Sequence, residues 1–196
     1  MRLYLLCARF AVAPWRAARR SVVAGMAIAL LALPAAAEDA ATVHGLIADR
    51  LALMKPVAAW KMERGAPVED LEREAVVLDK AVASAEENGL DGATARPFFE
   101  AQIAAAKAIQ TCWIGRWGYG EATPPAEVPD LREEIRPQLI DLGARMLEAI
   151  GGALEAGVTF DGAGKAAFDE RVNLPCLDRF SRLRIYTALG AIERAQ

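Results

Sequence analysis

The chain has few residues of the types that covalent and metal chemistry require. Its 196 residues include one histidine, His44, and three cysteines. A Ser-His or Cys-His nucleophile and a multi-histidine metal site are therefore disfavoured, and we predict no metal and no cofactor. We interpret His44, near the expected start of the folded domain, as a surface residue rather than a catalyst.

Strand signals are also scarce. β-Branched residues rarely cluster, whereas Ala, Leu, Glu, Arg and Lys recur at spacings of three and four residues, as in amphipathic helices. The sequence therefore predicts an all-α protein, a single domain of about five to six helices. The expected helices cover about 41–63, 68–88, 93–119, 131–156 and 177–194.

Glycine and proline separate these helices. Gly89 is a natural residue for the position just after a helix, and residues 123–129 hold too much proline to be helical. Pro56 is expected to bend the first helix. The first helix should turn inward Leu46, Ile47, Leu51, Met54, Val57 and Ala58, and the second Leu71, Ala75, Leu78, Val82 and Ala85.

Residues 1–37 have the pattern of a secretory signal. Basic residues precede an apolar stretch over 22–33, and small residues follow it with a cleavage site expected after Ala37. The alternative is an anchor that stays attached, but the apolar run is short for a membrane span. We therefore predict a periplasmic or secreted protein of residues 38–196, with no stable membrane anchoring.

Cleavage would remove five arginines and no acidic residue, so 18 basic residues would face 26 acidic ones and the net charge would move from −3 to about −8. Nucleic acid is thus not an expected partner. Cys7 would leave with the signal, so Cys112 and Cys176 form an even pair in an oxidising compartment. A disulfide between them is expected, with two buried thiols as the alternative.

Three basic residues stand in a helical register. Eleven steps of about 100° bring Arg50 and Lys61 onto one face of a helix, roughly 16 Å apart along its axis. A second helix would bring Arg73 alongside, next to Asp70 and Glu74 at spacings of three and four residues. This arrangement predicts a buried cationic pocket, against the plainer alternative of a solvated charged face.

The polar positions around these cations follow a wider pattern. It reads Asp49-Arg50-Leu, Pro56-Val-Ala-Ala-Trp-Lys61, Asp70-Leu-Glu-Arg73-Glu74 and Gln102-Ile-Ala-Ala-Ala-Lys107-Ala-Ile-Gln110. Over about residues 43–145 the chain resembles the all-helical (type II) chorismate mutases, and its lengthened tail resembles their secreted, periplasmic type. The resemblance implies a catalytic core over 43–120, a helical C-terminal extension over 129–196 and the rearrangement of chorismate to prephenate.

The resemblance also implies roles for individual residues. Arg50 would bind one substrate carboxylate, while Lys61 would contact both a carboxylate and the ether oxygen. Gln110 would donate a second hydrogen bond to that oxygen. Arg73 would orient the substrate, and Glu74 would accept a hydrogen bond from the ring hydroxyl.

Further residues complete the implied site. The Asp70 backbone would lie nearby, and an arginine after the proline connector would close the pocket, with Arg136 as the best match and Arg132 as the alternative. Ala106 departs from the family pattern, in which a hydroxyl is common, so one carboxylate contact is missing or replaced. Lys107 would add positive potential or be a solvated surface residue.

Chorismate is the expected small-molecule partner, and a homodimer is expected by analogy, with each site within one chain. Two other functions remain open on the sequence. One is an isochorismate pyruvate lyase, which would use much the same residues and would release pyruvate. The other is a non-catalytic periplasmic helical binding protein, for which the missing hydroxyl at Ala106 is the support.

Overall fold

The computed structural model describes residues 35–196, and the predicted signal segment therefore lies almost wholly outside the described residues. All regular elements in the described part are helical, which confirms the predicted fold class. They are α1 (Ala35–Ala52), α2 (Met54–Arg64), α3 (Leu71–Glu87), α4 (Gly92–Gly118), a π-helical turn (Leu131–Ile135), α5 (Arg136–Glu155), a 3₁₀-helical turn (Gly162–Gly164), α6 (Lys165–Arg171) and α7 (Arg179–Gly190).

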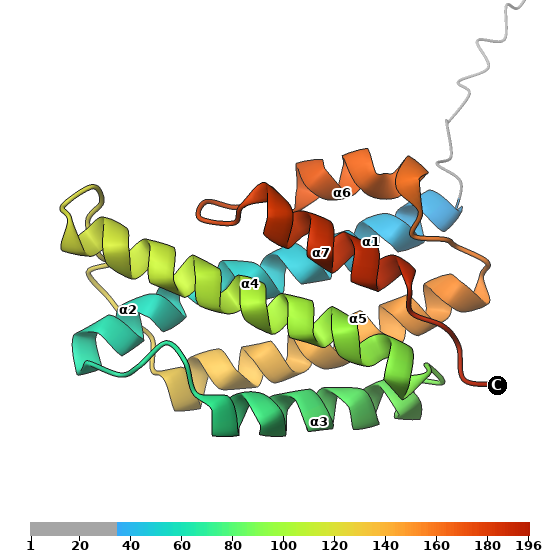
Figure 1. Cartoon of the computed structure of the whole chain (residues 1–196), viewed down its shortest axis with the longest axis horizontal. Coiled ribbons are helices and arrows are strands. Elements are labelled where there is room, and N and C mark those ends of the chain that lie inside the picture. The colour runs from blue at the N-terminus through green and yellow to red at the C-terminus, as the bar shows by residue number, and fades with distance from the viewer. Residues whose placement is uncertain (1–34) are drawn as a thin grey trace, which may run out of the picture. The chain divides into compact units, whose positions relative to one another are not determined.

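The longest helix, α4, is the element on which the others assemble. It packs against α2, α3 and α7 and also meets α1, while α1 packs along α5 (Figure 1). Phe98 and Ile109 of α4 are completely or almost completely buried. The face of α4 that is turned toward α1 and α2 therefore contributes both to the core and to the polar positions described below.

The predicted first helix is interrupted. It divides at Leu53 into α1 and α2, three residues before Pro56, which cannot donate a backbone hydrogen bond to Ala52. The helical register survives the break, because the Val57 amide still bonds to the Leu53 carbonyl at 3.1 Å. All six residues predicted to face inward from this segment are buried.

Helix α3 differs more from its prediction. Of the expected apolar stripe only Ala85 is buried, whereas Leu71 is 68 % exposed and Ala75 is also exposed. The prediction was wrong because α3 lies at the edge of the bundle against α4 and α5, so its first turns carry apolar residues on an uncovered face (Figure 1).

Helices α6 and α7, with the segments around them, form what we call the C-terminal cap, residues 157–196. The short α6 was not predicted, and the final helix is shorter than expected. A disulfide joins Cys112 of α4 to Cys176 just before α7, as expected from the sequence. The bond ties the cap to the central helix.

His44 is buried under this cap, so its interpretation as a surface residue was wrong. Its side chain is 2 % exposed and packs against Phe160, Phe168 and Tyr186, with ring centroids 5.2–6.2 Å away. Burial lowers the pKa of His44 to about 4, which keeps the imidazole neutral at physiological pH. It serves here as a core residue.

Candidate functional site

Two buried amides mark one face of α4. Gln102 and Gln110 are eight residues apart, with Ala106 between them, so all three share that face. Gln102 is fully buried and Gln110 is 5 % exposed. The Gln110 amide nitrogen donates toward the Met54 sulfur at 3.4 Å, and its buried oxygen has no hydrogen-bond partner among the described residues.

Arg50, in the last turn of α1, lies directly beside this face. One guanidinium nitrogen, Nη1, donates to the Gln102 side-chain oxygen at 3.3 Å. Burial lowers the pKa of Arg50 to about 10, a value at which the group is still charged at neutral pH. The structure therefore holds a half-buried positive charge against a neutral amide.

Lys61, near the end of α2, lies where the chain turns toward α3. Its ammonium donates to the Val68 carbonyl oxygen at 2.8 Å. Burial is the largest influence on Lys61 and lowers its pKa, while Asp70 and Glu74 act in the opposite direction and Arg136 adds to the lowering. Both carboxylates and a second cation are thus within electrostatic reach of the ammonium.

Arg136 opens α5 and is half-buried, whereas Arg132, one turn earlier, is exposed. The pKa of Arg136 is lowered by burial and then by the positive charges of Arg73 and Arg132. Of these two arginines, only Arg136 contributes to the lowered pKa of Lys61. The turn that positions them is held by Asp130, which accepts hydrogen bonds from the amides of Arg132 and Glu133 at 2.7 and 2.9 Å.

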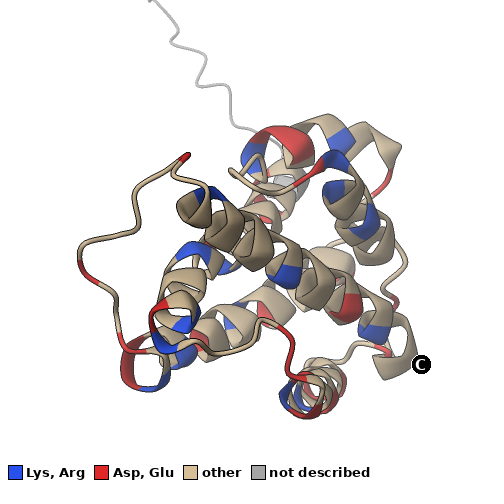
Figure 2. Cartoon of the chain, turned by 60° about the vertical axis from the view of Figure 1, so that its left-hand side comes forward, with Lys and Arg blue, Asp and Glu red and all other residues tan. Residues whose placement is uncertain are grey.

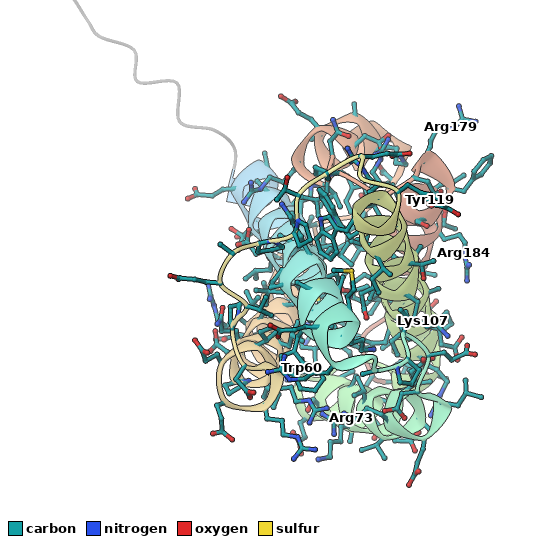
Figure 3. All side chains as sticks on the ribbon, turned by 90° about the vertical axis from the view of Figure 1, so that its left-hand side faces the viewer. Trp60, Arg73, Lys107, Tyr119, Arg179 and Arg184 are labelled. Carbon is teal, nitrogen blue, oxygen red and sulfur yellow. A yellow bond between two sulfur atoms is a disulfide. The ribbon has the colours of Figure 1, made fainter. Side chains whose placement is uncertain are left out.

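We refer to Arg50, Lys61, Arg73 and Arg136 as the cationic cluster. Four helices supply them: α1, α2, α3 and α5. None of the four has a carboxylate within ion-pair distance in residues 35–196. Figure 3 faces the end of the molecule where Trp60 and Arg73 lie, and Figure 2 shows that acidic residues are interspersed with basic ones over the helices.

The acidic side of the site is built by the start of α3. The Asp70 carboxylate caps the helix by accepting from the Arg73 amide at 3.0 Å, and Glu74 accepts from the Asp70 amide at 3.2 Å. Lys107 of α4 pairs with Glu74 at 2.9 Å and with Glu69 at 3.0 Å. These bonds raise the pKa of Lys107, so it is an ion-paired residue, not a lone surface lysine.

The structure thus brings together most of the residues that the sequence singled out, but the predicted burial of the cations was wrong in part, because Arg73 is exposed and Arg50, Lys61 and Arg136 are only half-buried. Lys61, Arg73, Arg136, Asp70 and Glu74 adjoin one another at one end of the bundle. Arg50 and Gln110 lie on the same side of α4, at the junction of α1 and α2.

Gln102 also belongs to this site, although the family resemblance implies no role for it. Its spacing of four and eight residues from Ala106 and Gln110, which puts all three on one face of a helix, was the signal that could have identified it.

A model of the family described as chorismate mutase type II matches residues 41–111. A secreted chorismate mutase from Yersinia pestis is 34 % identical over 138 residues, which cover 70 % of this chain and 73 % of that protein. A monofunctional chorismate mutase from Enterobacter agglomerans is 32 % identical over 148 residues, or 74 % of this chain and 79 % of that one.

The structure of the chain is also similar to that of a chorismate mutase. The crystal structure of the secreted chorismate mutase from Yersinia pestis superposes with a TM-score of 0.71 at 31 % identity, covering 78 % of this chain and 97 % of that structure. The chain therefore belongs to the type II chorismate mutase family, whose members are isomerases. Its similarity to secreted members confirms the predicted periplasmic or secreted localisation.

The family assignment favours the mutase over the two alternatives left open by the sequence, the lyase and the binding protein. In residues 35–196 no helix is both long and apolar enough to span a bilayer. No group of three potential metal ligands occurs in that range either.

Proposed function

We propose that the cationic cluster is the active site in which this chorismate mutase converts chorismate to prephenate. The observation that carries the proposal is the convergence of Lys61, Arg73 and Arg136 from three helices, beside the face of α4 that Arg50 contacts through Gln102. In the described part of the chain none of these four cations has an ion-pair partner. Charges held in this way destabilise the empty protein unless a ligand compensates them. A small dianion such as chorismate supplies that compensation.

The reaction suits such a site because it requires no nucleophile. The ether C–O bond of chorismate breaks as a C–C bond forms within the same molecule, and negative charge builds on the ether oxygen. The protein accelerates this step by holding the compact conformer and by stabilising the developing charge with donors fixed in advance.

Two residues would act on the ether oxygen. The Lys61 ammonium bonds to the neutral Val68 carbonyl, and a bound anion can replace that bond. Gln110 carries its amide on the buried face of α4, where its weak contact with the Met54 sulfur costs little to exchange. Both groups would donate a hydrogen bond to the oxygen in the transition state.

The remaining residues would bind and orient the substrate. Arg50 would bind one carboxylate, because its planar guanidinium makes paired charge-assisted bonds. Arg73 and Arg136 would orient the substrate from the other side, and Arg136 fits better than Arg132 because it is half-buried and near Lys61. Glu74 would accept from the ring hydroxyl, beside the Asp70 backbone.

We further propose that residues 1–37 are a signal peptide and that the mature enzyme comprises residues 38–196. Cleavage after Ala37 would remove the first three residues of α1, and the mature chain would carry no membrane anchor. A homodimer is proposed by analogy, with each site within one chain. Leu71 and Ile140, which are 68 % and 69 % exposed, are candidates for the contact, and sedimentation analysis would test it.

The test is turnover by purified residues 38–196. With chorismate as substrate, absorbance should fall and prephenate should accumulate without pyruvate. Isochorismate should give no pyruvate above the uncatalysed rate. Pyruvate release would identify a lyase, and ligand binding without any turnover would identify a binding protein, so each outcome separates the proposed function from an alternative.

A further inference from the structure

Gln102 is the polar residue of α4 for which the proposed reaction gives no direct role. It lies in the middle of the helix, it is fully buried, and an amide in that position costs free energy unless both of its ends find partners. Its oxygen accepts from Arg50 of α1, and its nitrogen is directed at the Met146 sulfur of α5 at 3.5 Å. The side chain therefore bridges two helices through α4.

The consequence for Arg50 follows from the charge of its partner. A guanidinium has five N–H donors, and only one of them is used by Gln102. A carboxylate in the same place would fix the guanidinium equally well, but it would cancel the charge that a substrate anion needs. A neutral amide oxygen orients the group and leaves both its charge and its other donors for the ligand.

We propose that Gln102 is a positioning residue that aligns the Arg50 guanidinium for a substrate carboxylate through an uncharged hydrogen bond. Gln102 does not touch the reacting atoms. Its effect reaches the substrate through Arg50, and so the inference rests on the proposed function. The Met146 contact supports the amide from the other side, but the weak acceptor strength of a thioether makes it the lesser of the two bonds.

Two substitutions test this role. Gln102→Leu keeps the size of the side chain and removes the acceptor, and it should raise KM for chorismate about tenfold, the usual worth of one hydrogen bond to a charged group. Gln102→Glu is nearly isosteric and places a carboxylate against Arg50. Its KM at pH 8 should rise more than that of Gln102→Leu.

The glutamate variant also provides a readout that a packing role would not give. Protonation restores a neutral carbonyl acceptor for Arg50, and the Arg50 charge lowers the pKa of the new carboxyl, so KM of Gln102→Glu should fall toward the wild-type value only as the pH drops from 8 toward 4. The wild-type protein has no titrating group at position 102, so the pH dependence of its KM is the baseline. Met146→Leu is the matched control, because it conserves volume, keeps the Arg50 bond and should stay within twofold of wild type.

The outcomes are separable. If wild type turns over chorismate but Gln102→Leu keeps kcat and KM within twofold, or if Gln102→Glu shows no new titration in KM, the positioning role is wrong and the proposed function stands. If wild type fails to turn over chorismate, the proposed function fails and this inference fails with it. Should circular dichroism show that Gln102→Leu does not fold, the pH profile of Gln102→Glu decides.

Discussion

The cationic cluster and the C-terminal cap differ in how their charged side chains are paired. In the cap, Asp169 pairs with both Lys165 and Arg182, and Arg182 also donates to the Asn173 oxygen at 3.3 Å. Asp178 caps α7 through the amides of Phe180 and Ser181. In the cluster, Arg50 and Lys61 donate to neutral oxygens instead.

The difference separates structural charge from functional charge. Paired groups in the cap satisfy one another, so they add little net energy and hold α6 and α7 in register. In the cluster, Lys61 and Arg136 lie partly out of water and near other cations, and both effects lower their pKa. The carboxylates of Asp70 and Glu74 offset this positive charge only in part, and the remainder is a cost to the empty protein that binding an anion reverses.

The sharpest test of the comparison removes one lysine from each region. Lys61→Ala should lower kcat/KM roughly 100- to 1000-fold, because it removes an electrostatic donor to the transition state. Lys165→Ala, on the cap, should leave kcat/KM unchanged, because its partner Asp169 retains Arg182. Steady-state kinetics and circular dichroism on both variants provide the measurement. Equal losses in the two variants would remove the distinction between the regions.

A second prediction concerns the protonation state of the side chain that would donate to the ether oxygen. Gln110→Glu should be slower than wild type by about 100-fold at pH 8, since a carboxylate cannot donate a hydrogen bond. The rate should recover as the pH falls and the acid becomes protonated. The pH dependence of kcat/KM from pH 8 to pH 5 measures this, and a profile parallel to that of wild type would refute the role of Gln110.

A third prediction concerns the cap, where a change of pH should alter the free energy of unfolding of the protein rather than its catalytic rate. The pKa of His44 is about 4 in the folded protein, below the unfolded value of about 6.5. The unfolded chain therefore takes up the proton first, so stability is constant above about pH 6.5 and falls as the pH drops toward 4. The loss from His44 alone is about 2 kcal/mol at pH 4.5 relative to pH 7.

Urea unfolding of His44→Phe at pH 7 and pH 4.5 isolates this contribution. Other groups titrate in both proteins, so the relevant quantity is the change in the pH-dependent part of the free energy of unfolding. That part should shrink in the variant by about 2 kcal/mol. An identical pH dependence in both proteins would mean that His44 is not held neutral by the cap.

Much of the fold could be predicted because the ends of its helices are set by residues close to them in the sequence. Gly89, with φ of 72°, ends the segment after α3 where expected, since a left-handed backbone favours glycine. The burial of His44 could not be predicted, because it depends on Phe160, Phe168 and Tyr186, more than 110 positions away in the chain. The seven-residue α6 was missed because it is too short for a periodic signal.

The candidate site shows the same division. The helical register placed Arg50 and Lys61 on one side of the first helical segment, and this survives the break at Leu53 because the backbone stays helical there. The sequence could not decide between Arg136 and Arg132. That choice depends on the π-helical turn before Pro137, which leaves Arg136 half-buried and Arg132 exposed.

The smallest expected effect lies at the border of the cluster, where Lys107 pairs with Glu74 as residues of the cap pair with each other. Lys107→Met should change stability by less than about 1 kcal/mol, because the pair is partly exposed to solvent. Its effect on KM should be about two- to fivefold, since Glu74 keeps its bond to the Asp70 amide and stays near its position. Steady-state kinetics would measure it. A loss as large as that of Lys61→Ala would instead move Lys107 from the border into the cluster, as a cation whose charge the substrate needs.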